Sequence, residues 1–482
     1  MSEQPRERES DFTLRTEFLH DDNQPPPSGE VRSDAVKGVV ITLIAAIVAY
    51  VAYAAVLPFD DVANKGLALA LFVGILWLTE AIHVTATAIL VPLVAILVGI
   101  PDFDTKAALS SFADPIIYVF FGGFALAATM HVQKLDKKIA YGLIGLAKGH
   151  LGAAVLMIFA VTAGLSMWIS NTATAAMMLP LALGLLTQVD EAKDRGTFVF
   201  VLLGIAYSAS IGGLGTLVGS PPNAIAAKEL GLDFAGWMGY GLPVMLVMMP
   251  LLLGTMYLVL KPKLNQKVDM AHQETIAWTT PRVLTIVVFV ITALSWIFGK
   301  QLGVAFGFKQ PDTVIALLAA VAVLMLGLVS WKQVSDNTDW GVLMLFGGGI
   351  ALSNIMKNSG ASAVLGEQIS SALAGAPAVV VILAIAAFII FLTEFTSNTA
   401  SAALLVPLFA PIGVALGLPP EVLVLVIGIG ASCAFMLPVA TPPNAIVMGT
   451  GHIKQREMMK VGFVLNLVSI VIVTVMAYLL WM

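Results

Sequence analysis

The sequence predicts an all-α membrane protein with about eleven transmembrane helices and two opposed re-entrant hairpins, related by an inverted repeat. Its residues are 59% hydrophobic and only 11% charged, with a mean hydropathy of +0.93, which excludes an ordinary soluble domain. The tripeptide Ser-Asn-Thr occurs twice, at 170–172 and 397–399, as a polar break inside apolar sequence. Hydrocarbon tolerates such breaks only where they are buried in protein or line a cavity, so the pair indicates one site shared by two halves.

The first 35 residues differ from the rest of the chain. Residues 1–35 carry nine acidic residues, four arginines and the run Pro25-Pro26-Pro27, which is typical of a disordered tail. These charges account for the formal net charge of −5, so the membrane-embedded remainder is close to neutral. The first transmembrane helix is expected over residues 36–57. The single Cys433 excludes an intrachain disulfide or a thiolate metal cluster.

The basic residues give the orientation. With the tail in the cytoplasm and each Ser-Asn-Thr segment at a hairpin tip, fourteen lysines and arginines of the short loops fall inside and six outside. This asymmetry agrees with the positive-inside rule. It opens the first hairpin, residues 150–187, to the cytoplasm, and the second, residues 376–416, to the outside. Opposite orientation of two similar elements is typical of an inverted repeat.

Two further landmarks are duplicated along with the tripeptide. Phe-Gly-Gly precedes each copy, at 121–123 and 346–348, and Pro-Pro-Asn follows each copy, at 221–223 and 442–444. The three landmarks recur in order with an offset between 221 and 227 residues, which chance helix caps would not readily supply. We therefore divide the body into a first repeat over 66–260, a connecting segment and helix over 261–311, and a second repeat over 312–482.

The double prolines predict interrupted helices. Proline lacks a backbone N–H and opposes helical geometry at the residue before it. We expect unwound backbone at 219–220 and 440–441, within broken helices over 198–229 and 421–449. Each half then offers two helix starts, whose free N–H groups carry partial positive charge. Four such starts can converge near the middle of the membrane.

The residue types at these breaks predict the ligands. Neither cluster contains lysine or arginine. Helix N-termini and hydroxyls favour an anion, whereas amide oxygens and free carbonyls favour a small hard cation such as sodium. Cations screen an anion that no basic side chain neutralises, so each ligand promotes binding of the other. Two equivalent clusters fit the two carboxylates of a short dicarboxylate.

At this point the chain resembles the divalent anion/sodium symporter family, which includes carriers of dicarboxylates, citrate and sulfate. Paired Ser-Asn-Thr motifs are the hallmark of that family, and residues 431–447 are similar to its signature. The likeness runs from about residue 36 to the C-terminus. It implies a homodimeric elevator-type transporter in the lipid bilayer of the plasma (bacterial inner) membrane that carries sodium ions together with its substrate. We expect no nucleic-acid partner.

The resemblance also implies roles for individual residues. The substrate carboxylates would contact Ser170, Asn171, Thr172, Ser220, Ser397, Asn398, Thr399, Thr441 and Pro442. Sodium site 1 would consist of Ser166, Ser170, Asn171 and the carbonyl of Gly219. Sodium site 2 would consist of Thr393, Thr396, Asn398 and the carbonyl of Ala440. The halves differ at Ser220 against Thr441 and at Ser166 against Thr393, which leaves the finer choice of substrate open.

The leading hypothesis is a sodium-coupled importer of C4 dicarboxylates such as succinate, fumarate or malate. A sodium-independent dicarboxylate exchanger is an alternative, since the family contains such exchangers, and a sodium-coupled citrate or sulfate transporter is another. An intramembrane enzyme would need a nucleophile with a base or an acidic metal site, so we expect no catalytic residue. A channel fits less well, because hairpins that stop midway are typical of alternating access.

Several ionisable residues lie in or beside apolar segments. Glu394 either tunes the nearby cation site or pairs with a neighbour. Glu80 and His83 are expected to end a span at the cytoplasmic interface. Asp114 and Asp339, which correspond in the two repeats, are expected to cap helices.

Overall fold

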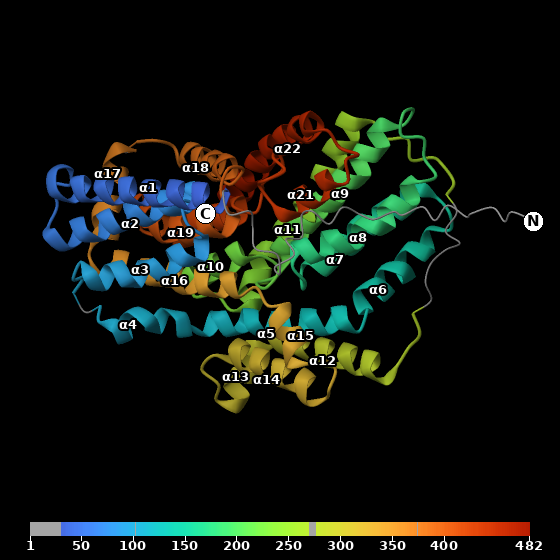
Figure 1. Ribbon diagram of the computed structural model, residues 1–482, viewed down its shortest axis with the longest axis horizontal. Coiled ribbons are helices and arrows are strands. Elements are labelled where there is room, and N and C mark those ends of the chain that lie inside the picture. Colours follow the sequence, from blue (N-terminus) through green and yellow to red (C-terminus); the bar gives the residue numbers. More distant parts are fainter. Residues whose placement is uncertain (1–29, 102, 269–275, 374) are drawn as a thin grey trace, which may run out of the picture.

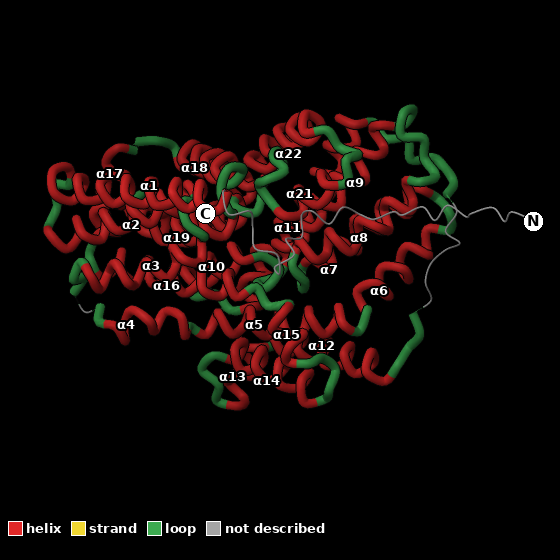
Figure 2. The backbone as a smooth tube through the Cα atoms, in the orientation of Figure 1, coloured by secondary structure: helices red, strands yellow, loops and turns green. Residues whose placement is uncertain are grey.

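The computed structural model describes residues 30–101, 103–268, 276–373 and 375–482. Within these ranges all regular elements are helices, apart from one isolated β-bridge between His150 and Lys267 (Figures 1 and 2). The predicted all-α class is confirmed. Helix α1 (Glu30–Val51) continues as a π-helical turn (Ala52–Val56), so residues 30–35, expected in the tail, are helical. Residues 1–29 of the expected tail lie outside the described residues.

Ten helices form the first half of the body. They are α2 (Asp61–Thr79), α3 (Val84–Leu97), α4 (Thr105–Ser110), α5 (Pro115–Val132), α6 (Leu135–Ile144), α7 (Leu151–Ser166), α8 (Asn171–Leu186), α9 (Arg195–Gly212), α10 (Pro221–Leu230) and α11 (Phe234–Leu260).

The second half follows the same order, with a short additional helix after its first member. Its helices are α12 (Thr280–Ile297), α13 (Gly299–Phe306), α14 (Pro311–Met325), α15 (Trp331–Asp336), α16 (Trp340–Asn358), α17 (Ala361–Ala372), α18 (Ala378–Leu392), α19 (Asn398–Ala415), α20 (Pro420–Gly430), α21 (Pro442–Gly449) and α22 (Gln455–Met476), which ends in a π-helical turn (Ala477–Trp481).

The apolar helices agree with a multi-pass membrane protein. Among the described residues, nine helices are long and apolar enough to cross a membrane, or ten if the bent pair α13–α14, with its angle of 92°, counts as one span. Helices α3, α7, α8, α18 and α20 are apolar but shorter. Hairpins α7–α8 and α18–α19 lie where the two re-entrant hairpins are predicted. Prolines 221 and 442 begin α10 and α21 after interruptions in both predicted broken helices.

The outer helices of the two halves pack crosswise. Helix α5 packs against α14, and α3 packs against α16. Both contacts use the Phe-Gly-Gly landmarks, because a Cβ on Gly122 would lie 2.6 Å from the carbonyl oxygen of Ala316, and a Cβ on Gly348 would lie 2.6 Å from Ala88. Small residues allow helix backbones to approach this closely within a membrane. Each half therefore completes the other, as an inverted repeat requires.

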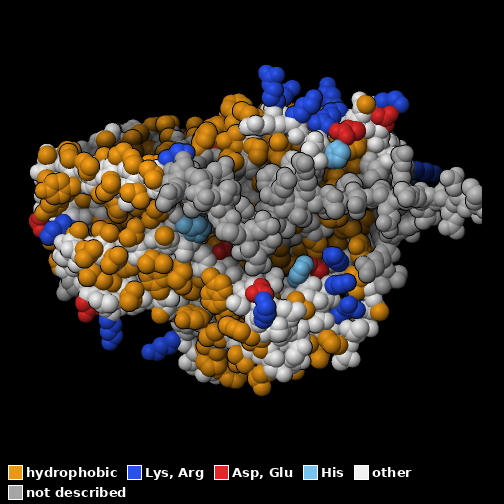
Figure 3. Space-filling view, viewed as in Figure 1, with side chains coloured by type: hydrophobic (Ala, Val, Ile, Leu, Met, Phe, Trp, Pro, Cys, Tyr) orange, Lys and Arg blue, Asp and Glu red, His pale blue; other side chains and the backbone are white. Residues whose placement is uncertain are grey.

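The hairpins and broken helices form an inner group. Helix α9 packs against α21, and α10 packs against α20, so the two broken helices cross. Helix α8 also contacts α21, and α10 contacts α19. Helix α9 is buried along its whole apolar span, whereas only 11% of the α1 span is buried. Hydrophobic side chains cover much of the described surface on the face shown in Figure 3, as a lipid-facing protein requires.

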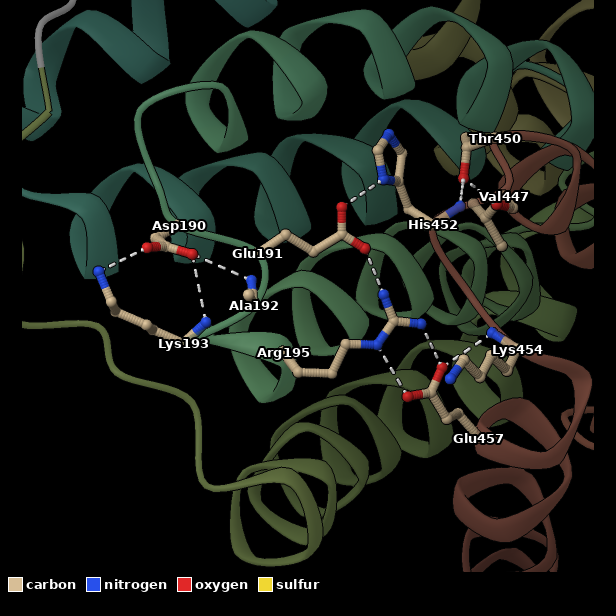
Figure 4. Close-up of polar contacts among 10 residues, drawn as sticks. All are labelled: Asp190, Glu191, Ala192, Lys193, Arg195, Val447, Thr450, His452, Lys454 and Glu457. Atoms are coloured by element: carbon tan, nitrogen blue, oxygen red, sulfur yellow. Dashed lines mark hydrogen bonds and ion pairs between the residues drawn. The ribbon is translucent and has the colours of Figure 1, made fainter.

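A polar cluster joins the two halves at one end of this inner group (Figure 4). The guanidinium of Arg195, at the start of α9, donates two hydrogen bonds to Glu457 of α22, at 2.9 and 2.6 Å, and also contacts Glu191. His452 lies 2.9 Å from the second Glu191 oxygen. Because both loops belong to predicted cytoplasmic ends, the cluster fixes the end of the first hairpin against α21–α22.

Candidate functional site

Each Ser-Asn-Thr segment begins the second helix of its hairpin. Ser170 is the N-cap of α8, and its hydroxyl accepts a hydrogen bond from the Ala173 N–H at 3.2 Å. Ser397 caps α19 in the same way, through the Ala400 N–H at 3.4 Å. Capping fixes where each helix starts, and the asparagine that follows is its first helical residue. The tripeptide is therefore a helix start in both halves, with its free N–H groups at the hairpin tip.

A hydroxyl fastens each asparagine to the neighbouring broken helix. The Ser166 hydroxyl lies 2.5 Å from Asn171 Oδ1 and 2.7 Å from the carbonyl oxygen of Ala209. The Thr393 hydroxyl lies 2.6 Å from Asn398 Oδ1 and 2.9 Å from the carbonyl oxygen of Ala431. A hydroxyl has one proton, so it cannot donate to both acceptors at once. Each tip therefore gathers more oxygen lone pairs than protons, an environment that suits a cation.

The backbone before each double proline is unwound, as predicted. Ser220 has φ −149° and ψ 137°, and Thr441 has φ −143° and ψ 147°, both extended. The Ser220 hydroxyl lies 3.2 Å from the hydroxyl of Ser432 in the other broken helix. The Thr441 hydroxyl accepts the Asn444 N–H at 3.3 Å. The two unwound loops thus meet each other in the inner group.

The asparagines of the Pro-Pro-Asn landmarks, which were not predicted as functional residues, hold these loops. Asn223 is fully buried, and its amide donates to the carbonyls of Gly213 and Thr216 at 2.8 and 2.7 Å. Asn444 is also fully buried and donates to Ala434 and Leu437 at 3.2 and 3.0 Å. In an intact helix these carbonyls would accept hydrogen bonds from backbone N–H groups. In the unwound loops the side-chain amides of the two asparagines donate those bonds instead. The duplication of the asparagine was the signal that could have identified this role.

Glu394 holds the second loop only. Its side chain is fully buried, and its carboxylate accepts the backbone N–H groups of Phe435, Met436 and Leu437 at 2.7, 2.9 and 3.0 Å. The Asn466 amide of α22 also donates to it, at 2.7 Å. The corresponding residue of the first hairpin is Met167. Of the two expectations for Glu394, the structure shows pairing with neighbours, and these neighbours form a loop of the predicted site.

The predicted substrate residues line one cavity of about 760 Å³. Both tripeptides and both unwound loops border it, through Ser170, Asn171, Thr172, Ser220, Ser397, Asn398, Thr399, Thr441 and Pro442. Of the predicted sodium ligands, Gly219, Thr396 and Ala440 also border the cavity, whereas Ser166 and Thr393 are fully buried behind the asparagines. The Thr396 hydroxyl turns to Ser401 at 2.7 Å and to the Leu392 carbonyl at 3.1 Å.

The cavity extends toward one end of the outer helices. Its other lining residues include Glu80, His83, His131, Asp136 and Asp339, but no lysine or arginine among the described residues. Glu80 ends α2, as predicted, whereas His83 caps the start of α3. The cytoplasmic side expected for both residues stays a prediction. Asp339 caps α16 through the Val342 N–H. Every positive group available to an anion in this cavity is therefore a backbone dipole, a histidine or a bound cation.

The opposite ends of α5 and α16 are closed against α10. Asp114 caps α5 and lies 2.5 Å from Lys228 of α10. Glu229 of α10 contacts Lys357 at 2.7 Å and the Ser353 hydroxyl at 2.9 Å. A small pocket of about 80 Å³ lies beside these ion pairs. The inner group is thus sealed against the outer helices on one side and separated from them by the cavity on the other.

Comparison with known proteins gives a consistent result. The family described as the sodium:sulfate symporter transmembrane region matches residues 33–482. An uncharacterized transporter of Haemophilus influenzae is 56% identical over 435 residues, covering 89% of this chain and 94% of that protein. The sodium-dependent dicarboxylate transporter SdcS of Staphylococcus saprophyticus is 33% identical over 466 residues, covering 87% of each chain.

Two solved transporters share the fold. The YdaH transporter of Alcanivorax borkumensis aligns with a TM-score of 0.58 at 14% identity, covering 82% of this chain and 98% of that one. MtrF of Neisseria gonorrhoeae aligns with a TM-score of 0.53 at 13% identity, covering 97% and 98%. At these identities the likeness concerns the fold alone.

Proposed function

Because the chain belongs to the sodium:sulfate symporter family of multi-pass membrane transporters, which are not enzymes, we propose that it imports C4 dicarboxylates such as succinate, fumarate and malate together with sodium ions. The observation that carries this proposal is that two helices, starting at Asn171 and Asn398, begin at one cavity. The described residues that line this cavity include no lysine or arginine.

The helix starts suit the two carboxylates of the substrate. Ser170 and Ser397 present hydroxyls, and the first-turn N–H groups of α8 and α19 carry partial positive charge. The tips come from opposite halves of the fold, so one carboxylate binds at each. The name of the staphylococcal relative, a sodium-dependent dicarboxylate transporter, supports this substrate class.

Sodium supplies the charge that the side chains do not. At each tip, a hydroxyl faces an asparagine oxygen and a helix carbonyl with a single proton, and the unwound carbonyls of Gly219 and Ala440 lie beside the cavity. A sodium ion at each tip would satisfy these oxygens and offset the negative charge of the substrate. Substrate and sodium then increase each other's affinity, which is the basis of coupling.

The closed and open sides support an elevator mechanism. With the N-terminus in the cytoplasm, the ion-paired ends of α5 and α16 lie outside, and the cavity reaches their inner ends at His131 and Asp339. The inner group of hairpins and broken helices would slide against the outer helices, carrying the site across the bacterial plasma membrane. The conformation described here is then inward-facing, and we propose that two such subunits form a homodimer.

Uptake of labelled succinate into proteoliposomes tests the proposal. We expect uptake to depend on an inward sodium gradient and to be competed by fumarate and malate. Uptake that requires internal dicarboxylate and ignores sodium would identify an exchanger instead. Stronger competition by citrate or sulfate would change the substrate and leave the mechanism in place.

A further inference from the structure

Gly213, in the helical turn that directly follows α9, lies against the oxygens of predicted sodium site 1. A Cβ built on Gly213 would lie 2.6 Å from Asn171 Oδ1 and 2.8 Å from the carbonyl oxygen of Gly219. Both oxygens belong to the predicted ligand set. Real Cβ atoms do not approach other heavy atoms this closely, so the two oxygens can share this space only because residue 213 has no side chain.

The backbone conformation does not explain why residue 213 is glycine. Gly213 has φ −56° and ψ −21°, which lies in the right-handed helical region that any L-residue adopts. Its carbonyl is held by the Asn223 amide at 2.8 Å, so the position of the residue is fixed. The absence of a side chain therefore provides space and not conformational freedom.

The second repeat has a methyl group at the corresponding position. Ala434 stands at the same distance before its Pro-Pro-Asn landmark as Gly213 does before the first one, and it is fully buried. Its carbonyl is likewise held by the amide of Asn444. The two tips are otherwise built alike, from a hydroxyl, an asparagine oxygen and a helix carbonyl. Residues 213 and 434 therefore occupy corresponding positions in two otherwise similar tips and differ by one methyl group.

We propose that Gly213 is a specificity-determining residue for the co-transported cation, because its missing methyl group sets the space around the ion at site 1. Hard cations require oxygen ligands at short and well-defined distances, so displacing either Asn171 Oδ1 or the Gly219 carbonyl weakens the site. We expect the two sites to bind sodium with different affinities, because only one of the two corresponding positions carries a methyl group. This inference rests on the proposed sodium-coupled function.

The test is the variant Gly213→Ala with Gly215→Ala as its matched control. Gly215 belongs to the same helical turn, but the atoms nearest to its added Cβ belong to the flexible side chains of Met245 and Met167. Thermal melting of each purified protein is followed during titration with sodium chloride against a potassium chloride background, without substrate. Stabilisation by an ion measures its binding to the folded state. A parallel titration with lithium chloride tests selectivity by ion size.

We expect Gly213→Ala to raise the half-saturating sodium concentration by about tenfold, with a smaller loss for lithium because it is the smaller ion. Gly215→Ala should titrate like the wild type. If Gly213→Ala and Gly215→Ala titrate alike, the inference is wrong. If instead the wild type shows no response to sodium, it is the proposed function that fails.

A second variant decides the case in which Gly213→Ala does not fold. Ala434→Gly removes the methyl group at the corresponding position of the second repeat, where the smaller residue introduces no clash. We expect it to reduce the preference for sodium over potassium in the same titration. Unchanged selectivity in Ala434→Gly would overturn the proposal that this position sets the space around the ion.

Discussion

The Asp114 carboxylate, at the start of α5, lies 2.5 Å from the Lys228 ammonium near the end of α10. Together with the pair of Glu229 and Lys357, this contact joins the inner group to the outer helices on the side that is closed. The corresponding end of α21 carries Gly449 and Thr450 in place of Lys228 and Glu229. In the proposed elevator mechanism, these ion pairs would favour the conformation described here over the opposite one.

Removing this contact should shift the conformational equilibrium. We expect Asp114→Asn to favour the opposite conformation by about 1 kcal/mol, or roughly fivefold, because the ion pair is only partly exposed. Labelling of a cysteine introduced at Ile225, which lines the small pocket, measures the opening of the closed side. The native Cys433 is buried, so we expect it to contribute little background labelling.

Two controls accompany this measurement. Lys228→Met breaks the same pair while leaving the Asp114 cap of α5 in place, so it should change the labelling rate as Asp114→Asn does. Asp336→Asn breaks an exposed pair with Lys332 within α15 and should leave labelling unchanged. Equal labelling of Asp114→Asn and the wild type would show that the ion pair does not bias the conformation.

The two asparagines at the hairpin tips are expected to be essential for transport. Asn171→Ala and Asn398→Ala each remove an oxygen that faces a hydroxyl at 2.5 or 2.6 Å and borders the cavity. We expect each variant to lose sodium-dependent succinate uptake while remaining folded. Asn358→Ala, at the exposed end of α16, is the control and should transport normally. Full transport by both tip variants would place the site elsewhere.

Glu394 should be sensitive even to an isosteric change. Glu394→Gln keeps the size of the side chain but turns an amide N–H₂ toward N–H donors of the 435–437 loop or of Asn466. A lost hydrogen bond to a buried charged group costs about 2 kcal/mol, so we expect a lower melting temperature and weaker sodium binding. Glu421→Gln, in the first turn of α20, serves as the control. A melting temperature equal to that of the control would contradict the role of Glu394.

The clamp at Arg195 depends on the fork of the guanidinium. Arg195→Lys keeps the charge but cannot donate two parallel hydrogen bonds to Glu457. We expect thermal melting in detergent to show a loss of about 1 kcal/mol in stability. This loss should become smaller in high salt, because salt screens the ion pair in the wild type. Lys193→Ala, which removes an exposed pair with Asp190, should have no measurable effect. Identical melting of the two variants would show that the bidentate contact adds nothing.

The sequence predicted those parts of the site that depend on local chemistry. Ser170 and Ser397 cap helices, and the residues before Pro221 and Pro442 are extended, because side-chain capping and proline geometry act over a few residues. The roles of Ser166 and Thr393 as sodium ligands remain predictions, although the structure places their hydroxyls against the two asparagines.

Other contacts could not be predicted, because they join segments far apart in sequence. Asp114 was expected to cap a helix, which it does, but its contact with Lys228 depends on how α10 packs near α5 and α16. Glu394 reaches the 435–437 loop about forty residues away, and nothing in its local sequence indicates that loop. Gly213 is one of 42 glycines, and only its neighbours in space distinguish it.

The crosswise packing of α3 on α16 and of α5 on α14 has a consequence for biosynthesis. When the ribosome has completed the first half, the Gly122 face of α5 has no partner, and Phe120 lacks its ring contact with Phe346, at 4.8 Å between centroids. The nascent first half must therefore remain loosely assembled in the membrane until α14 and α16 are inserted. The packing of the first half is therefore completed by helices that are synthesised later, and two separately expressed halves should associate in the membrane through these faces.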